Sequence, residues 1–170
     1  MTHTPPADHC PRERRKRSIL LAVFTSIISK GGNFLLNIGP SPKGEFAPDA
    51  YDRLREIGAW MSINGAAIYN TRPFAPYKDG KISFTSLKNG TVFAIYLADE
   101  NETGPPAKIV IHGIDPLADA SVKMLGADVP LKWQRTANGI EVLIPADVRS
   151  KIVAKYAWTF RISGLRNSQS

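Results

Sequence analysis

Apolar residues recur at helical spacing in two stretches of the first half of this chain, with a short, nearly all-apolar run between them. Residues 18–29 predict a helix, ended by the glycine pair that follows Lys30. Residues 48–64 predict a second helix, because Pro48 suits a first helical position and the apolar residues form one stripe. The run 34–38 predicts a strand that is apolar on both faces, as in a parallel sheet or barrel. Helix, buried strand and helix indicate a fragment of α/β architecture.

After residue 74 the period changes to short alternating runs rich in Val, Ile, Thr and aromatic residues. Hairpin turns are indicated at Lys88-Asn89-Gly90 and at Ala137-Asn138-Gly139. One-sided strands of this kind are typical of an antiparallel sheet with one face in water, and their number predicts a small β-sandwich. The predicted strands are 82–87, 91–98, 108–112, 121–125, 131–136, 139–144 and 157–163. The fold class is therefore α+β.

The block from Ser29 to Pro40, SKGGNFLLNIGP, resembles a signature of family 29 glycoside hydrolases, the retaining α-L-fucosidases. The similarity continues through residues 52–60 and 64–74, and the strands at 82–85 and 92–97 look like the opening strands of that family's C-terminal sandwich. The resemblance covers about residues 18–165 and matches the order of elements read from periodicity.

This resemblance implies three parts of the chain. Residues 18–73 would be the last helix-strand-helix portion of a (β/α)8-type barrel, and residues 74–170 the C-terminal β-sandwich domain. Residues 1–17 have no hydrophobic period and do not look like any part of the family, so we expect a disordered basic tail there.

Retaining glycosidases need two carboxylates about 5–5.5 Å apart, one as nucleophile and one as acid/base. In the family both residues lie upstream of the stretch that this chain resembles, so the resemblance assigns no catalytic residue here. We therefore expect the C-terminal portion of an α-L-fucosidase that is catalytically incomplete as a lone chain.

Two residues are candidates for contact with a sugar. Asn37 ends the predicted buried strand, where barrel enzymes place functional side chains, although an asparagine there can equally satisfy loop backbone groups. Trp133 could stack on a sugar ring. We expect Trp60 to be a barrel-helix contact and Trp158 to be a sandwich core residue.

No metal site or cofactor is predicted. Three acidic residues at positions 99, 100 and 102 make a calcium site conceivable, but their spacing follows no recognised calcium loop. His112 has no nameable partner and is expected to be structural. The histidines of the tail form no metal-ligand pattern with Cys10. The acidic residues Glu45, Asp49 and Asp52 are expected to serve the start of the second helix.

The formal net charge of +7 raises nucleic-acid and membrane readings. The first 17 residues hold five basic and two acidic residues, and so carry +3 of that total. No aromatic residues accompany this arm, so we expect no nucleic-acid partner. The apolar stretch 19–28 imitates a signal peptide but is too short to span a bilayer, so a soluble helix is favoured. One cysteine permits no intramolecular disulfide, which slightly favours a cytoplasmic over a secreted location.

Three functions stay open at this point. The chain is an inactive piece of a fucosidase, or a working subunit completed by further copies or by a chain supplying the rest of the barrel, or a non-catalytic carbohydrate-binding sandwich. Fucosylated glycans are the partners that the complete family implies.

Overall fold

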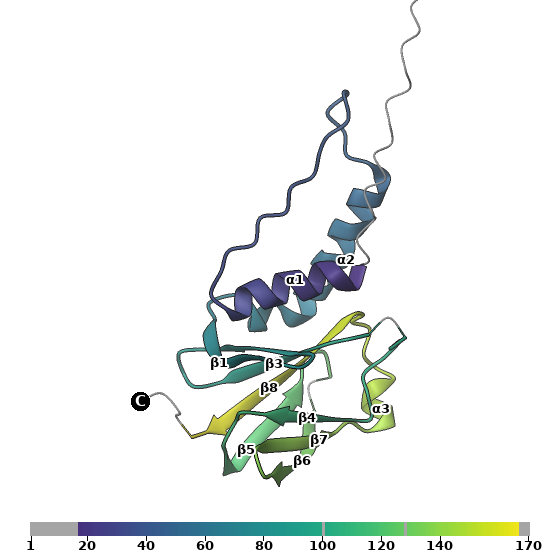
Figure 1. The fold of residues 1–170 in the computed structure, drawn as a ribbon. Helices are drawn as coiled ribbons and strands as arrows, with labels where there is room; N and C mark the ends of the chain where they lie inside the picture. The colour runs from purple at the N-terminus through teal and green to yellow at the C-terminus, as the bar shows by residue number, and fades with distance from the viewer. Residues whose placement is uncertain (1–16, 100, 128, 167–170) are drawn as a thin grey trace, which may run out of the picture.

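Two helices lie on one face of a curled antiparallel sheet in the computed structural model, which describes residues 17–99, 101–127 and 129–166 (Figure 1). The helices are α1 (Arg17–Ser29) and α2 (Pro48–Asn64), and a single 3-10 turn, η1 (Gly65–Ala67), follows α2. Both predicted helices are confirmed. Residues 30–47, the projecting segment, rise away from the sheet and return into the start of α2 (Figure 1).

Eight strands form the sheet, and all seven predicted strands are among them. The eighth, β1, was missed because its two prolines argue against a strand, yet prolines are tolerated on an edge strand such as this one. A short helix, α3 (Ala146–Arg149), was also missed. The strands are β1 (Arg72–Asp79), β2 (Ile82–Ser86), β3 (Val92–Leu97), β4 (Lys108–His112), β5 (Pro116–Met124), β6 (Pro130–Thr136), β7 (Gly139–Leu143) and β8 (Ala157–Leu165).

The strand order is β1-β2-β3-β8-β5-β6-β7-β4, and every pairing is antiparallel. β6 links the two halves, because Leu131 lies opposite Val122 of β5 while residues 132–136 pair with β7. The expected sandwich is thus two layers of one continuous sheet. Its core draws on both halves and includes Phe84, Ile111, Met124, Ile140, Val142, Trp158, Phe160 and Ile162. Trp158 is a core residue of the sandwich, as expected.

A second core lies between the helices and the outer face of the sheet. Leu21 of α1 and Trp60 of α2 pack there against Phe93, Ile95 and other residues of β3 and β8. Trp60 contacts the other helix through the Phe24 ring, and its own ring also lies on the sandwich sheet, which was not expected from the sequence. It thereby joins the helical layer to the strands.

Residues 34–38 differ from the expected buried strand. They are extended, yet they form no ladder with any segment that the structure describes, and Leu35 is 83% exposed. The physical reason is that a strand is defined by its neighbour, whose N–H and C=O groups must complete its hydrogen bonds. The described parts of the chain offer no such neighbour to this run.

Candidate functional site

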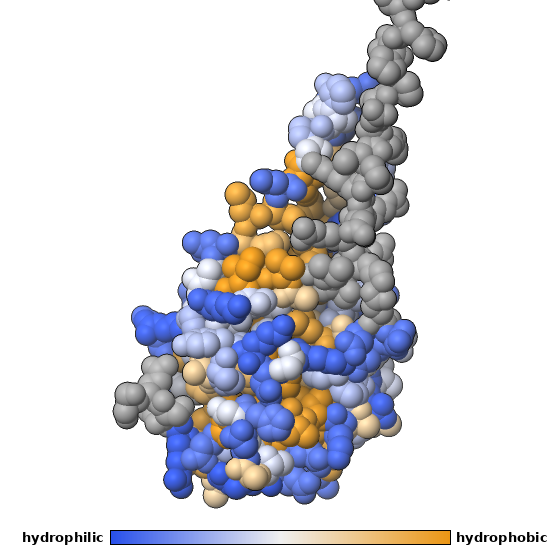
Figure 2. All heavy atoms as spheres, in the orientation of Figure 1, coloured by the Kyte–Doolittle hydropathy of each residue, from blue (hydrophilic) through white to orange (hydrophobic). Residues whose placement is uncertain are grey.

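The helical layer carries an apolar groove on the side that the projecting segment overhangs. The groove has a volume of about 150 Å³ and is lined only by apolar side chains. In Figure 2 hydrophobic side chains gather above the strands, over the helices. The lining residues are Leu20, Leu21, Phe24, Phe34, Leu36, Leu54 and Ile57.

Four large apolar side chains of the projecting segment and α2 are partly or largely exposed, and we call them the apolar face; Leu36 and Leu54 among them also line the groove. They are Leu35 (83% exposed), Leu36 (38%), Tyr51 (43%) and Leu54 (40%). Two come from the projecting segment and two from α2. Single exposed apolar residues are ordinary, but several of them at an apolar groove make this surface the candidate for binding another polypeptide or ligand.

Local contacts hold the start of the projecting segment and close its tip. Gly31 ends α1 in the left-handed conformation (φ +79°), and its N–H donates to Ile28 O at 2.9 Å. The Phe34 ring meets the edge of Phe24, with centroids 5.5 Å apart. At the tip, the Ser41 N–H donates to Glu45 O at 2.7 Å and closes a turn. The segment therefore presents its apolar side chains from an anchored backbone.

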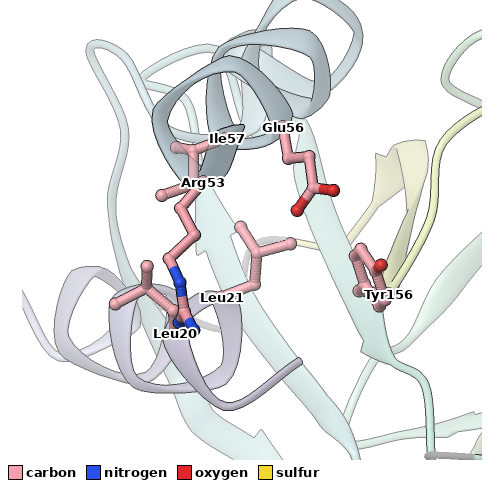
Figure 3. Close-up of a pocket in the computed structure, with 6 residues that line it drawn as sticks. All are labelled: Leu20, Leu21, Arg53, Glu56, Ile57 and Tyr156. Atoms are coloured by element: carbon pink, nitrogen blue, oxygen red, sulfur yellow. The ribbon is translucent and has the colours of Figure 1, made fainter. Parts of the chain in front are cut away.

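A smaller pocket lies at the seam between α1, α2 and the entry to β8. Figure 3 shows Glu56 pointing down between Leu21 and Tyr156, while Arg53 reaches toward Leu20. The pocket has a volume of about 20 Å³, which holds about one water molecule and no sugar ring. This seam belongs to the packing of the two layers.

The structure does not bring the two predicted sugar contacts together. Asn37 is exposed on the projecting segment, above the helices, whereas Trp133 lies on β6 at the far end of the sandwich (Figure 1). The Trp133 ring is half-buried against the core, and its Nε1–H donates to Ala120 O at 3.0 Å.

The acids once considered for calcium hold an ammonium group instead. The Lys81 Nζ contacts a carboxylate oxygen of Asp99 and lies 3.3 Å from Glu102 Oε2. The Tyr96 hydroxyl donates to Glu102 Oε1 at 2.8 Å. Residue 100 lies outside the described residues. Among the residues that the structure describes, no group of three or more His, Cys, Asp or Glu side chains is placed to hold a metal.

These contacts change the acidity of the groups. The Asp99 carboxylate is the largest of the causes that raise the pKa of Lys81 well above its ordinary value. Burial would raise the pKa of Glu102, but hydrogen bonds from the Asp99 N–H, Tyr96 and Lys81 outweigh it and lower that pKa. Burial, with the bond to Glu102, raises the pKa of Tyr96. At neutral pH the charged Lys81, Asp99 and Glu102 therefore hold the loop after β3 against the sheet through these ion pairs.

His112 has a partner that the sequence did not reveal. Its Nδ1 lies 2.7 Å from Asp79 Oδ2, so the end of β4 is joined to the end of β1. The tail histidines and Cys10 lie outside the described residues. No described helix is both long and apolar enough to cross a bilayer.

Comparison with known proteins gives two matches to family models. The model for α-L-fucosidase matches residues 8–66, and the model for the α-L-fucosidase C-terminal domain matches residues 77–163. The first match starts ten residues before the start at 18 that the sequence resemblance indicated. The expectation that residues 1–17 resemble no part of the family is therefore wrong from residue 8 onward. Residues 8–16 lie outside the described part of the chain.

Curated relatives agree with these matches. The chain is 34% identical over 150 residues to an α-L-fucosidase of Branchiostoma floridae, covering 86% of this chain and 32% of the relative. It is 31% identical over 156 residues to the tissue α-L-fucosidase of Homo sapiens, covering 89% and 32%. The chain thus spans about a third of the length of these relatives.

The fold also matches a solved enzyme structure. The Thermotoga maritima α-fucosidase in complex with fucose superposes with a TM-score of 0.72 at 27% sequence identity. The match covers 86% of this chain and 34% of the other. The expected α+β class, with the end of a barrel followed by a β-domain, is confirmed.

Proposed function

Because this chain belongs to the α-L-fucosidase family, we propose that it is the C-terminal portion of a retaining α-L-fucosidase, with the catalytic carboxylates supplied from outside the chain. In the complete enzyme the reaction is hydrolysis of terminal α-L-fucosyl linkages on fucosylated glycans. Residues 18–73 contribute the end of the catalytic barrel, and residues 74–170 form the C-terminal β-sandwich domain that packs against it.

The observation that carries this proposal is the extended run 34–38, whose Leu35 and Leu36 belong to the apolar face. An extended run without a ladder leaves its N–H and C=O groups free to pair with a neighbouring strand. Its apolar side chains then need cover on both faces, as they would find inside a barrel. The order of helix, extended run and helix supports the same placement.

Three ion-paired carboxylates of the described chain support an outside source for the catalytic pair. Asp52 contacts Arg55 at 3.0 Å, on the exposed side of α2. Asp115 contacts Arg135 at 2.7 Å, and Glu141 contacts Lys108 at 2.8 Å. The nucleophile and the acid/base must instead face each other across a bound sugar, about 5–5.5 Å apart.

Asn37 and Trp133 keep their proposed roles as sugar contacts, on separate grounds. Asn37 follows the run 34–38, whose end would face the active site once that run is paired as a barrel strand. Its exposed amide is then available to donate to a sugar hydroxyl. Trp133 is half-buried, so only part of its ring is free for stacking.

Two other readings share the same family membership. Several copies, or a second chain, complete the barrel around the run 34–38, and the apolar face favours this over a free monomer. A purely carbohydrate-binding sandwich would not need that face. Mass measurement in solution separates these readings, because a clean, inactive monomer excludes self-assembly.

The direct assay is hydrolysis of an aryl α-L-fucoside by the purified chain. We expect no turnover above the rate of a buffer control. Turnover that disappears when one Asp or Glu of this chain is changed to Asn or Gln would overturn the proposal. Turnover that survives every such change identifies a contaminating fucosidase, and the proposal then stands.

A further inference from the structure

The two edge strands of the sheet meet at one corner. β1 and β4 lie at opposite ends of the strand order, yet Asp79 of β1 and His112 of β4 are 2.7 Å apart. Next to this pair, a Cβ on Gly113 would lie 2.9 Å from Pro76 Cδ, so the Pro76 ring packs closely on Gly113. Gly113 is in the left-handed conformation with φ +75°, which the absence of a side chain permits.

A wide bulge in β1 builds this corner. β1 pairs with β2 at Pro73 and again at Lys78, and the four residues between them stand opposite Phe84 alone. Phe74 turns inward, with its ring 6.3 Å from that of Phe84. Bulges on edge strands redirect side chains and are frequent beside binding sites. The bulge therefore separates an inward aromatic residue from an outward one.

Tyr77 is the outward residue. It is 46% exposed, and its φ of +68° lies in the left-handed region that bulky side chains rarely adopt. Such a conformation costs free energy and persists where the surroundings fix it, most often at sites that bind. The corner thus fixes a tyrosine at the surface, two residues from Asp79 and beside the contact of Pro76 with Gly113.

We propose that this corner binds a neutral pyranose residue of a glycan. The Tyr77 ring offers a flat face for the C–H bonds of the sugar. Asp79 and His112 are half-exposed and orient each other, and each keeps a second polar atom, Asp79 Oδ1 and His112 Nε2, for ligand hydroxyls.

The pairing of Asp79 with His112 argues for an uncharged ligand. The carboxylate already has a ring nitrogen as its partner, and so does not present a bare charge to a cation. The atoms that remain, Asp79 Oδ1 and His112 Nε2, can accept hydrogen bonds from sugar hydroxyls, and the exposed Tyr77 two positions before Asp79 supplies an aromatic face. No residue of the apolar face takes part, so the corner is separate from the surface proposed to complete the barrel.

The choice of a sugar as ligand rests on the proposed function, and its test does not. A ¹⁵N-labelled sample of the chain is titrated with methyl α-L-fucopyranoside and, separately, with methyl β-D-galactopyranoside. We expect saturable shifts of the backbone amides of Tyr77, Asp79 and Gly113 with at least one of them. Binding would be measured without any turnover, so an inactive chain that binds sugar is a positive result.

Three variants make the test specific. Tyr77→Gly removes the ring and suits the left-handed backbone, so the fold is kept, and we expect affinity to fall about tenfold or more. Tyr77→Phe keeps the ring and retains most of the affinity. Tyr69→Ala removes another exposed tyrosine, 64% exposed and outside the corner, and leaves affinity unchanged.

Either of two results overturns the proposal. One is that neither pyranoside causes saturable shifts at the corner up to its solubility limit. The other is that Tyr77→Gly, with an unchanged thermal unfolding midpoint, binds as tightly as the original chain. If the chain alone hydrolyses fucosides, the proposed function fails and this titration keeps its meaning.

Discussion

Trp60 on α2 donates its indole N–H to the carbonyl oxygen of Ala157 on β8, at 2.9 Å and across 97 positions of sequence. The Trp60 ring is buried, and the Phe24 ring of α1 meets it edge-on with centroids 6.5 Å apart. One side chain thus ties both helices to the sheet. The end of the barrel and the β-domain share a core through this contact.

Removing Trp60 should therefore destabilise the whole described fold. Trp60→Ala leaves a large cavity between the layers and is expected to lower the free energy of unfolding by about 3–5 kcal/mol. Trp60→Phe keeps much of the packing but leaves Ala157 O without its donor, at a cost of about 1–3 kcal/mol. Urea unfolding measures both. If Trp60→Ala unfolds at the same urea midpoint as the original chain, the two layers are not coupled through this residue.

The apolar face should bind hydrophobic probes. Leu35→Asp and Leu54→Asp are expected to reduce the fluorescence of a bound hydrophobic dye. Leu35 is 83% exposed, so its variant should change stability by less than about 0.5 kcal/mol, whereas Leu54 also lines the groove and its variant should cost more. Val153→Asp is the matched control, since Val153 is 77% exposed and lies outside the apolar face. Equal dye binding by all three variants would mean that this face is not the exposed apolar surface of the chain.

Glu102 should stabilise the fold at neutral pH and not in acid. Its folded pKa is held below the ordinary value of 4.5, so its contribution is present above the unfolded pKa and is lost as pH falls through the folded pKa. Glu102→Gln is expected to lower the free energy of unfolding by about 1 kcal/mol at neutral pH. The difference from the original chain should vanish below the folded pKa.

Unfolding curves at several pH values check this, with Glu45→Gln as the control on the exposed turn of the projecting segment. The control is expected to follow the original chain throughout. A destabilisation by Glu102→Gln that is as large in acid as at neutral pH would show that the charge of Glu102 is not what holds the loop.

Trp133 packs against the core and is also a proposed sugar contact, and one pair of variants separates the two contributions. Trp133→Ala removes a half-buried ring and the donor to Ala120 O, so we expect a loss of about 2–4 kcal/mol of stability. Trp133→Phe keeps a flat ring and should retain most of any sugar binding. Titration with methyl α-L-fucopyranoside, followed by tryptophan fluorescence, gives the binding readout. A Trp133→Ala variant that folds and binds sugar normally would remove Trp133 from the candidate contacts.

Periodicity predicted most of the fold because most elements bury one face against something within this chain. The stripe through Tyr51 and Leu54 marked α2, and the alternation of Trp158, Phe160 and Ile162 marked β8. β1 has no such alternation, since four of its residues form a bulge opposite a single residue of β2. The run 34–38 carried the pattern of a buried strand, but pattern alone does not supply a neighbouring strand.

Contacts between distant residues were beyond local patterns. Asp79 and His112 are 33 positions apart, and only the closing of the sheet brings them together. The left-handed backbone of Tyr77 could not be predicted from the sequence either, because Gly, Asn and Asp, and not tyrosine, are the residues typical of that conformation. Asn37 stays a predicted sugar contact, and the structure shows only that its side chain is exposed. Its role depends on what pairs with the run 34–38.

The most direct test of the account asks whether any carboxylate of this chain is a glycosidase nucleophile. The chain is incubated with a 2-fluoro-fucosyl fluoride, which loses fluoride as a catalytic carboxylate bonds to its anomeric carbon and so traps the glycosyl-enzyme. Intact mass spectrometry then reads the product. We predict an unchanged mass, and an increase by one fluorofucosyl group, located by peptide mapping on an Asp or Glu of this chain, would contradict the account.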